Sequence, residues 1–390
     1  MRFLTSGESH GPLLTGILEG MPAGLPLTSA DVDADLLRRQ QGYGRGGRMS
    51  IEKDHVRFAA GVVAGLTTGS PIALLVENRD YKNWVEKTID PMTTPRPGHA
   101  DLTGAIKYGY RDLRLSLERA SARETTMRVA VGAVCKKLLA AFDIRVQGYV
   151  TAIGDVVADL PPTDDYAARF EAAEASEVRC PDAAATERMH EAIKEAIQAK
   201  DTLGGIIEVA AINVPPGLGS HVHYDRKIDG QLMGAVGSIH AMKGVEIGQA
   251  FAQALMRGTE VHDAIHVHDG KLSRNSNRAG GLEGGITTGE PIIVRAAMKP
   301  IATTLNPLDS VDLATGEARS IDYERSDFCA VPRAVVVVEA MVAIVLATAL
   351  LEKLGGDSME ELRPRFAALR QNCVADVPMD NQPWQFNYDY

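Results

Sequence analysis

The sequence predicts an α+β fold, a β-α-β sandwich in which a helical layer lies between two mainly antiparallel sheets. The first observation is an internal repeat, because residues 65–72 (GLTTGSPI) and 285–292 (GITTGEPI) share six of eight positions. The second is the order of elements before each copy: a strand candidate, a P-x-G-L turn and a helix candidate. Two internally duplicated halves would cover each other's helices, whereas two unrelated turns of ordinary composition are the weaker alternative.

One domain is expected over residues 1–390, because no Pro/Ser-rich linker divides the chain. Its halves cover about 1–145 and 205–355, and the acidic segment 150–204 is an insert between them. In each half the T-T-G triplet is expected to be the turn of a hairpin. The first half is expected to contain a strand at 16–19, a turn at 22–25, a helix at 29–40 and a strand at 73–76. The corresponding elements of the second half are expected at 205–208, 215–218, 229–241 and 293–296.

Two further helices are predicted from their first residues. Ser121 and Glu124 have the spacing of a capping box, which would open a helix over 122–142. Pro332 suits the first position of a helix that runs to about Leu354 and stops at two glycines. Both helix starts follow arginine-bearing loops, and the unpaired amides of a helix N-terminus favour anions. The sequence therefore directs two helix ends toward an anionic ligand.

Composition indicates a soluble globular protein with a sizeable core. Apolar residues make up 45% and charged residues 24% of the 390 residues. The longest apolar run, 334–351, contains Glu339, which favours a buried core helix over a membrane span. No secretory signal is readable, and four separated cysteines without a C-x-x-C pair indicate reduced thiols. A cytoplasmic location is expected.

Charge is unevenly distributed along the chain. The net charge of −10 argues against a general nucleic-acid or membrane surface. Residues 155–208 hold thirteen acids and five bases, whereas 38–57 hold six bases and two acids, and 96–128 hold seven bases and four acids. Guanidinium groups bind carboxylate and phosphate through paired hydrogen bonds. The two basic stretches predict a site for a small polyanion, with a solvated charged face as the alternative.

Residues 7–11 (GESHG) match the G-x-S-x-G pattern of a serine-hydrolase nucleophile elbow. An elbow requires a buried strand before it and a helix after it. At most six residues precede this motif, and a strand candidate over 13–19 follows it. A serine nucleophile is therefore disfavoured, and a polar loop whose glycines let the backbone approach a ligand is the preferred interpretation.

Other polar motifs carry weaker signals. His99 follows a Pro-Gly turn and is a reasonable general acid, although a lone histidine is more often structural. The histidines of 221–223 and 262–268 lack a metal-binding spacing such as H-E-x-x-H, so no metal site is expected. The glycine-rich stretch 41–48 matches neither a P-loop nor a dinucleotide fingerprint.

A series of ordered motifs runs along nearly the whole chain. They are GESHG (7–11), Arg39 with Arg45, RPGHAD (96–101), RASARET (119–125), HAMKGVEIG (240–248), AGGLEGG (279–285), KPIAT (299–303), and RSDFC (325–329) with PRA (332–334). Together they closely resemble the chorismate synthase family. One departure is local, because Ala120 stands where many members have serine.

The resemblance implies a carbon–oxygen lyase acting on phosphates. Members convert 5-enolpyruvylshikimate 3-phosphate to chorismate by anti 1,4-elimination of phosphate, in the shikimate pathway of aromatic amino acid biosynthesis. Reduced FMN is required although there is no net redox change. The substrate carries two carboxylates and a phosphate, which fits the predicted polyanion. A flavin-independent phosphate lyase or transferase, and a non-catalytic binder of phosphorylated ligands, are the alternatives.

The resemblance also implies roles for individual residues. His10 would protonate the departing phosphate, and His99 would protonate the reduced flavin. Asp327 would take up the hydrogen removed from the substrate ring as a proton, through flavin N5, with Ser9 in the relay. Ser121 is a further expected catalytic residue, which lies with His10 beside the substrate. The expected substrate-binding residues are Arg39, Arg45, Arg123 and Arg325. The expected flavin-binding residues are Arg119, Ala120, Ser121, His240, Ala241, Gly284, Lys299, Pro300, Ile301, Ala302, Thr303 and Arg325.

Partners follow from the same resemblance. NADP would contact Arg39 and Arg45 if the enzyme reduced its own flavin. The sequence shows no separate nicotinamide-binding module, so an external flavin reductase is expected and NADPH acts only indirectly. A homotetramer is implied, and neither nucleic acid nor membrane is expected as a partner.

Overall fold

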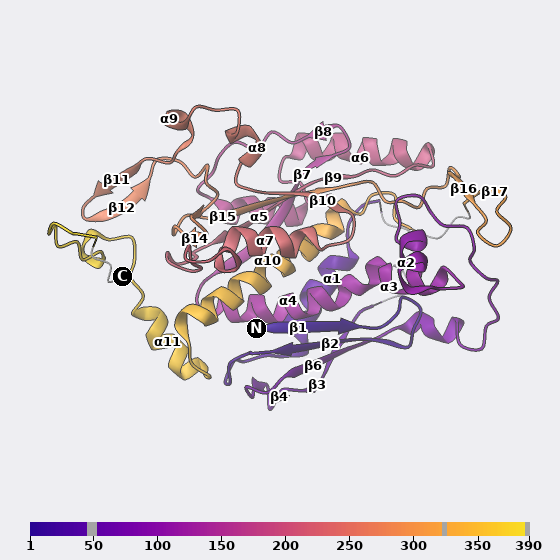
Figure 1. The fold of residues 1–390 in the computed structure, drawn as a ribbon, viewed down its shortest axis with the longest axis horizontal. Coiled ribbons are helices and arrows are strands. Elements are labelled where there is room, and N and C mark those ends of the chain that lie inside the picture. The colour runs from indigo at the N-terminus through magenta and orange to yellow at the C-terminus, as the bar shows by residue number, and fades with distance from the viewer. Residues whose placement is uncertain (45–52, 322–325, 387–390) are drawn as a thin grey trace.

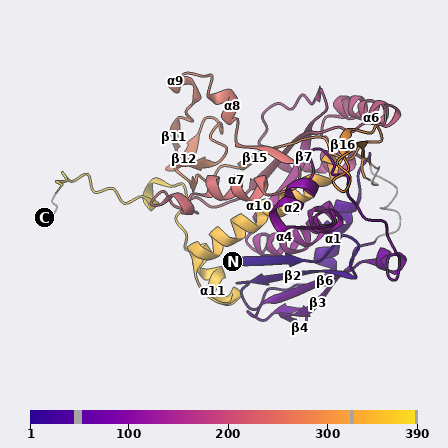
Figure 2. The same cartoon turned by 45° about the vertical axis from the view of Figure 1, so that its right-hand side comes forward.

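Two antiparallel sheets enclose a layer of helices in the computed structural model, which describes residues 1–44, 53–321 and 326–386 (Figures 1 and 2). The strand order is β1-β2-β6-β3 in the first sheet and β10-β15-β9-β7-β8 in the second. Every neighbouring pair in both sheets is antiparallel. The predicted α+β sandwich with a central helical layer is confirmed.

The elements fall into three groups by position. The first sheet contains β1 (Arg2–Ser6), β2 (Leu13–Glu19), β3 (Val56–Ala60) and β6 (Ile72–Glu77), and the second contains β7 (Arg145–Ile153), β8 (Val156–Val157), β9 (Gly205–Ile212), β10 (Met242–Ile247) and β15 (Ile292–Met298). The helical layer contains α1 (Ser29–Gln40), α4 (Thr125–Ala140), α7 (Ile228–Gly237) and α10 (Val331–Leu354). The outer elements are α2 (Asp101–Tyr108), α3 (Arg114–Ala120), α5 (Tyr166–Ala175), α6 (Ala183–Gln198), α8 (Ala250–Gln253), α9 (Gly258–Val261), α11 (Met359–Ala367), and the two-stranded ladders β4–β5 (Val62–Val63, Leu66–Thr67), β11–β12 (Ile265–His268, Lys271–Arg274), β13–β14 (Leu282–Glu283, Ile286–Thr287) and β16–β17 (Asp309–Val311, Ala318–Ser320).

The two halves repeat one arrangement of strands and helices. The order β1-β2-α1-β3-β6-α4 in the first half corresponds to β7-β9-α7-β10-β15-α10 in the second. The acidic segment leaves β7 and returns through β9, its neighbour in the same sheet, and carries β8, α5 and α6. In the structure, the second copy of the repeat thus begins near Arg145 and encloses the acidic segment.

Each half fastens its P-x-G-L turn to its T-T-G triplet in the same way. Thr67 Oγ1 donates to Pro22 O at 2.6 Å, and Leu25 N donates to Thr67 Oγ1 at 2.9 Å. In the second half Thr287 makes the same two bonds to the turn at 215–218, at 2.7 and 2.9 Å. The repeat therefore extends from residue types to individual hydrogen bonds.

The hairpin prediction for the T-T-G triplets is wrong in detail. The short hairpins are β4–β5 and β13–β14, which turn at 64–65 and 284–285, and each triplet begins within the hairpin's second strand. The triplet then leads into β6 or β15, which pair with other strands. The first threonine of each triplet is bonded to the P-x-G-L turn. This contact between distant segments sets the position of the triplet.

The predicted capping box at Ser121 is also wrong. Residues 122–124 form a single 3-10 turn, and α4 starts at Thr125. Ser121 Oγ accepts from Arg123 N at 3.3 Å, while the Glu124 carboxylate accepts from Thr5 Oγ1 at 2.7 Å and Arg128 Nε at 2.9 Å. Tertiary partners thus draw the Glu124 side chain away from the local cap.

The helix expected over 229–241 is shorter, because α7 ends at Gly237. Helix α10 is apolar on all sides and lies in the core, as predicted. It is long and apolar enough to cross a membrane, but 83% of its most apolar 18-residue stretch is buried against the rest of the chain. A side chain at Gly132 of α4 would lie 2.3 Å from Ala340 Cβ of α10, so the two helices cross closely at this glycine.

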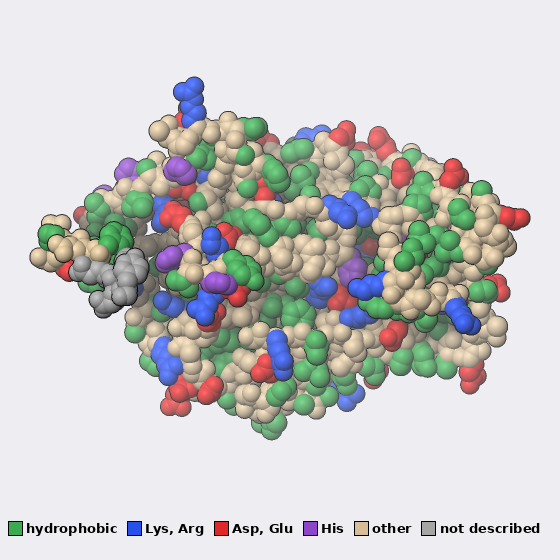
Figure 3. Space-filling view, viewed as in Figure 1, with side chains coloured by type: hydrophobic (Ala, Val, Ile, Leu, Met, Phe, Trp, Pro, Cys, Tyr) green, Lys and Arg blue, Asp and Glu red, His purple; other side chains and the backbone are tan. Residues whose placement is uncertain are grey.

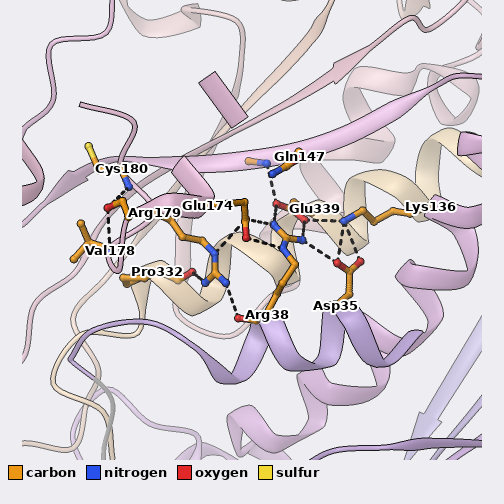
Figure 4. Close-up of polar contacts among 12 residues, drawn as sticks. Asp35, Arg38, Lys136, Gln147, Glu174, Val178, Arg179, Cys180, Pro332 and Glu339 are labelled. Carbon is orange, nitrogen blue, oxygen red and sulfur yellow. Dashed lines mark hydrogen bonds and ion pairs between the residues drawn. The ribbon is translucent and has the colours of Figure 1, made fainter. Parts of the chain in front are cut away.

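Glu339 interrupts the apolar α10 and is completely buried (Figure 4). Its carboxylate accepts from both terminal nitrogens of Arg38 on α1, at 2.7 and 2.9 Å, and from Lys136 Nζ on α4, at 2.9 Å. Gly148 N of β7 donates a further bond at 2.9 Å. Burial alone would raise the pKa of Glu339, but the charges of Arg38 and Lys136 outweigh burial and hold it well below its usual range.

We expect Glu339→Gln to destabilise the fold by about 3 kcal/mol, because removing one partner of a buried ion pair leaves the other charges uncompensated. The measurement is urea unfolding at pH 7. Glu352→Gln, at an exposed position of the same helix, is the matched control and should change stability by less than about 0.5 kcal/mol. Equal stability of the two variants would contradict the role given to Glu339.

The contribution of Glu339 should also depend on pH. The pKa of Glu339 is lower in the folded state than the value of about 4.3 for an unfolded glutamate. Its stabilisation is therefore complete above that value and is lost as the pH falls toward the folded-state pKa. We expect the difference in unfolding free energy between the parent and Glu339→Gln to shrink from about pH 6 to about pH 3. A difference that is independent of pH would show that charge pairing is not its cause.

Candidate functional site

The loop of residues 7–12 connects β1 to β2 and is held from two sides. Ser9 N donates to Glu118 O on α3 at 3.1 Å. Asn78 Nδ2 donates to Ser9 O at 2.8 Å and to Gly11 O at 2.9 Å. The GESHG motif therefore lies in a fixed polar loop between antiparallel strands, as preferred from the sequence, and does not open a helix.

His10 is oriented by Glu118. Its backbone N donates to Glu118 Oε2 at 2.8 Å, and its Nδ1 lies 2.7 Å from Glu118 Oε1. The indole of Trp84 lies against the imidazole, with ring centroids 4.0 Å apart. Burial would raise the pKa of Glu118, but the hydrogen bonds from His10 outweigh it and lower the pKa. A carboxylate at Nδ1 fixes the orientation of the imidazole.

Ser9 and Ser121 lie between His10 and the buried arginines. Ser9 is 1% exposed, and Ser121 Oγ donates to Ser9 Oγ at 3.0 Å. Ser121 Oγ also accepts from Arg123 N at 3.3 Å. The structure thus brings together both predicted serines, His10 and Arg123.

Two buried guanidinium groups share one carboxylate. Arg39 Nη2 donates to Asp54 Oδ2 at 2.9 Å, and Arg123 Nη1 donates to Asp54 Oδ1 at 2.7 Å. Burial would raise the pKa of Asp54, but the charges of Arg39 and Arg123 outweigh it and lower the pKa. Burial lowers the pKa of Arg39 to about 10, and the nearby charges of Arg333 and Arg123 act in the same direction. Two cations beside one acid leave an excess of positive charge, which favours an anionic ligand.

Asp327 joins this cluster through Arg333 in the first turn of α10. Arg333 Nη1 donates to Asp327 Oδ2, and Arg333 Nε donates to Arg39 O at 3.0 Å. The remaining substrate-binding candidates, Arg45 and Arg325, lie outside the described residues.

A second polar group surrounds His99. Its Nδ1 lies 2.5 Å from Asp101 Oδ1, and Arg96 Nε donates to Asp101 Oδ2 at 2.8 Å. Burial would raise the pKa of Asp101, but the hydrogen bonds from His99 and Arg96 hold it well below its usual range. Arg96 Nη1 donates to Thr303 Oγ1 at 3.3 Å. His99 is therefore oriented by a buried acid, Asp101, whereas His10 is oriented by the partly exposed Glu118.

The two polar groups are linked through Thr303. Ser326 Oγ donates to Thr303 O at 3.0 Å, and Asp327 is the next residue along the chain. Figure 3 shows the face of the molecule that is turned toward the viewer in Figure 1. On this face, over α3 and α4, a histidine side chain lies recessed in a hollow among lysine or arginine side chains.

Several of the predicted cofactor-binding residues border the His99 group. Lys299 N donates to Ala241 O at 3.0 Å, and Ala241 has the left-handed φ of 65°. A Cβ on Gly98, beside His99, would lie 3.5 Å from Lys299 Nζ and 3.7 Å from Ala302 Cβ. Partial burial and the neighbouring Lys243 lower the pKa of Lys299.

His240 precedes Ala241 and is largely buried. Burial lowers its pKa, although the charge of Glu124 opposes the shift. Its buried Nδ1 has no hydrogen-bond partner within residues 1–44, 53–321 and 326–386. Arg119, at the end of α3 beside Ala120, donates to Gly7 O at 3.1 Å and to Thr5 O at 2.8 Å.

Gly284 is not brought to this group. It lies in the turn of the β13–β14 ladder, where an added Cβ would meet His221, and the neighbouring Gly285 O accepts from Ile228 N at 3.0 Å. The β14 strand is on the left in Figure 1, whereas α2 and α3 are on the right. The ladder is fastened to the start of α7, and this contact holds Gly284 away from Lys299.

Some site residues were not assigned from the sequence. Asp54, Glu118 and Arg333 each hold a predicted residue through a side-chain bond. Glu118 and Arg333 stand beside or inside recognised motifs, which was an available signal. Asp54 carried no such signal, because its partner Arg123 lies 69 residues further along the chain.

Comparisons with known proteins agree with one another. The family model described as chorismate synthase matches residues 1–351. A relative from Trichlorobacter lovleyi, named chorismate synthase, is 54% identical over 380 residues, covering 93% of this chain and 97% of the relative. A chorismate synthase from Thermus thermophilus is 54% identical over 389 residues, covering 96% of this chain and 100% of the relative.

A solved structure gives the same result. It is a crystal structure of a chorismate synthase and superposes with a TM-score of 0.78 at 47% sequence identity, covering 94% of this chain and 96% of the solved chain. The model match over most of the chain, the sequence relatives and the shared fold establish that this chain belongs to the chorismate synthase family.

Proposed function

We propose that this chain converts 5-enolpyruvylshikimate 3-phosphate to chorismate by eliminating phosphate, with reduced FMN as cofactor. The observation that carries the proposal is that Ser9, next to the acid-oriented His10, bonds to Ser121, whose hydroxyl accepts from the backbone of the buried Arg123. A substrate with two carboxylates and a phosphate requires such positive charge, and a departing phosphate requires a proton donor.

Substrate binding is assigned to Arg39 and Arg123, with Arg45 and Arg325 added by likeness to the family. Asp54 pairs with both described arginines, so an anionic group of the substrate would share the two guanidinium groups with this carboxylate. Arg39 Nε is buried and, within the described chain, has no hydrogen-bond partner, so it can donate to a bound anion.

His10 is assigned the proton that the departing phosphate takes up. Glu118 holds the imidazole in place through Nδ1. Ser9 and Ser121 hydrogen-bond beside it and are assigned to proton relay and substrate contact. Asp327 is assigned the removal of the ring hydrogen, and Arg333 holds its carboxylate in place.

Several of the residues expected to hold flavin lie around His99 and have side chains that suit this cofactor. Gly284 lies apart from them, in the turn of the β13–β14 ladder. The expected flavin-binding residues offer a lysine at 299, a guanidinium at 119 and, at His240, a buried ring nitrogen that has no hydrogen-bond partner in the described chain and lies 4.0 Å from Glu124 Oε2. These donors suit the carbonyl groups and the phosphate of FMN. When bound, reduced FMN would supply an electron to the allylic system and take it back, which leaves no net redox change. His99, which Asp101 orients, is assigned the protonation of the reduced flavin.

We propose that residues 1–390 form a single domain. In support, one apolar cluster includes buried residues of both halves. By likeness to the family we propose a cytoplasmic homotetramer. Its flavin would be reduced by a separate reductase, and NADPH would act directly only if Arg39 and Arg45 bind it.

Anaerobic incubation of the purified protein with 5-enolpyruvylshikimate 3-phosphate and reduced FMN should release phosphate and form the conjugated diene of chorismate. The arm without flavin should form neither, because the arginines and His10 alone do not supply the electron. Phosphate assay and ultraviolet absorbance measure the two products. Equal turnover without flavin would favour a flavin-independent lyase, and no product in the reduced-FMN arm would refute the proposal.

His10→Ala should lower turnover by about a hundredfold to ten-thousandfold, because a general acid is removed from the leaving phosphate. Binding of FMN, measured by flavin fluorescence, should be kept. His268→Ala, at a side chain that is 88% exposed on β11, is the matched control and should keep full turnover. Turnover of His10→Ala within threefold of the parent would remove the assigned role.

A further inference from the structure

We propose that Arg179, which the acidic segment supplies, is a positioning residue for the anion site. The proposal rests on the proposed function, because it assigns a task to a residue behind the substrate arginines. Arg179 is 3% exposed. Its guanidinium faces two main-chain carbonyls from helices that are far apart in the sequence, at Arg38 and Pro332 (Figure 4).

The two acceptors lie directly before two site residues. Arg179 Nη2 donates to Arg38 O at 2.7 Å near the end of α1, and Arg179 Nη1 donates to Pro332 O at 2.7 Å in the first turn of α10. The next residues are Arg39, which binds Asp54, and Arg333, which binds Asp327. One planar guanidinium thus sets the separation of the two helix ends from which the buried charges project.

The contact suits the end of α1. Arg38 O is among the last carbonyls of α1, where a cation interacts favourably with the helix dipole. Arg333 Nε adds a second link between the same helices by donating to Arg39 O at 3.0 Å. Without Arg179, the end of α1 would be joined to α10 by this bond and, further along α10, by the Arg38–Glu339 ion pair. The main chain before Arg39 and the main chain before Arg333 would then no longer be bonded to one common group.

The acidic segment holds Arg179 in an uncommon backbone conformation. Its φ of 54° is left-handed, a region that non-glycine residues rarely adopt. Arg179 N donates to Ser176 O at 3.0 Å, and Val150 N of β7 donates to Arg179 O at 2.8 Å. Glu174 Oε1 lies 3.5 Å from Arg179 Nε and balances its charge. Strained backbone that is held by several contacts is typical of a position whose side chain has a required direction.

The same segment supports the chain on both sides of the site. Tyr43 N donates to Glu177 O at 2.9 Å, and the ring of Tyr43 stacks on His190 of α6 with centroids 4.6 Å apart. Leu203 N donates to Phe328 O at 2.9 Å, next to Asp327. The acidic segment therefore supports the chain behind the site, and Arg179 bonds to the residues that directly precede Arg39 and Arg333.

The test compares Arg179→Lys and Arg179→Gly with the parent. Lysine keeps the charge beside Glu174 but has one nitrogen, so it cannot reproduce a planar pair of bonds to two carbonyls. Glycine accepts the left-handed φ without strain and removes the guanidinium. Arg188→Lys, at an exposed arginine of the same segment, is the matched control.

The measurements are kcat and KM with reduced FMN, the melting temperature, and calorimetric Kd values for 5-enolpyruvylshikimate 3-phosphate and for inorganic phosphate. We expect both Arg179 variants to raise KM and both Kd values by about tenfold, because losing one or two hydrogen bonds changes an equilibrium by about this factor. The value of kcat should stay within about threefold of the parent. Added guanidinium chloride at millimolar concentration should partly restore Arg179→Gly, which a purely structural defect would not allow. Arg188→Lys should match the parent.

Two results would overturn the positioning role. One is a Kd for phosphate within twofold of the parent in both Arg179 variants. The other is a rise in KM that accompanies unfolding below the assay temperature and that guanidinium does not restore. The phosphate measurement requires no turnover, so a parent without chorismate synthase activity would refute the proposed function while the Kd comparison still decides the role of Arg179.

Discussion

The helical layer depends on one buried carboxylate. Glu339 is a fully buried acid within the apolar helix α10, and it accepts bonds from α1, α4 and β7 at once. Burying a charge is unfavourable unless partners surround it, and here they come from both halves of the repeat. The carboxylate therefore fixes how α1 and α4 of the first half lie against α10 of the second, and these helices cannot shift without separating opposite charges.

The candidate site is built directly on that arrangement. Arg38 turns toward Glu339 inside the layer, and the next residue, Arg39, turns toward Asp54 and Arg123 in the site. The buried charges of the site are paired in a similar way, because Arg39 and Arg123 share the Asp54 carboxylate. At Asp54 two guanidinium groups are held by one acid, which favours an anionic ligand there.

The duplication explains the shape of the molecule but not its chemistry. The P-x-G-L turns and T-T-G threonines are bonded alike in both halves, at positions that carry no candidate catalytic group. The candidate groups are different in the two halves: Arg123 precedes α4, whereas Asp327 precedes the corresponding helix α10. His10 comes from the first half and Lys299 from the second. The acidic segment, present in one half only, breaks the symmetry and places Arg179 behind the junction.

Local patterns in the sequence determined the repeat, the central helices and most of the site residue types, because strand, turn and helix signals act over a few residues. The motif around His10 and the glutamate within the apolar run are both readable from the order of residues alone. Partners were decided only by the tertiary structure: Asp54 for Arg123, Glu118 for His10, and Glu339 for Arg38. The structure also turned Glu124 away from its expected cap and placed Gly284 apart from Lys299. Such contacts join residues tens to hundreds of positions apart, and side chains satisfy buried charge with whatever group packing brings near, which no local pattern encodes.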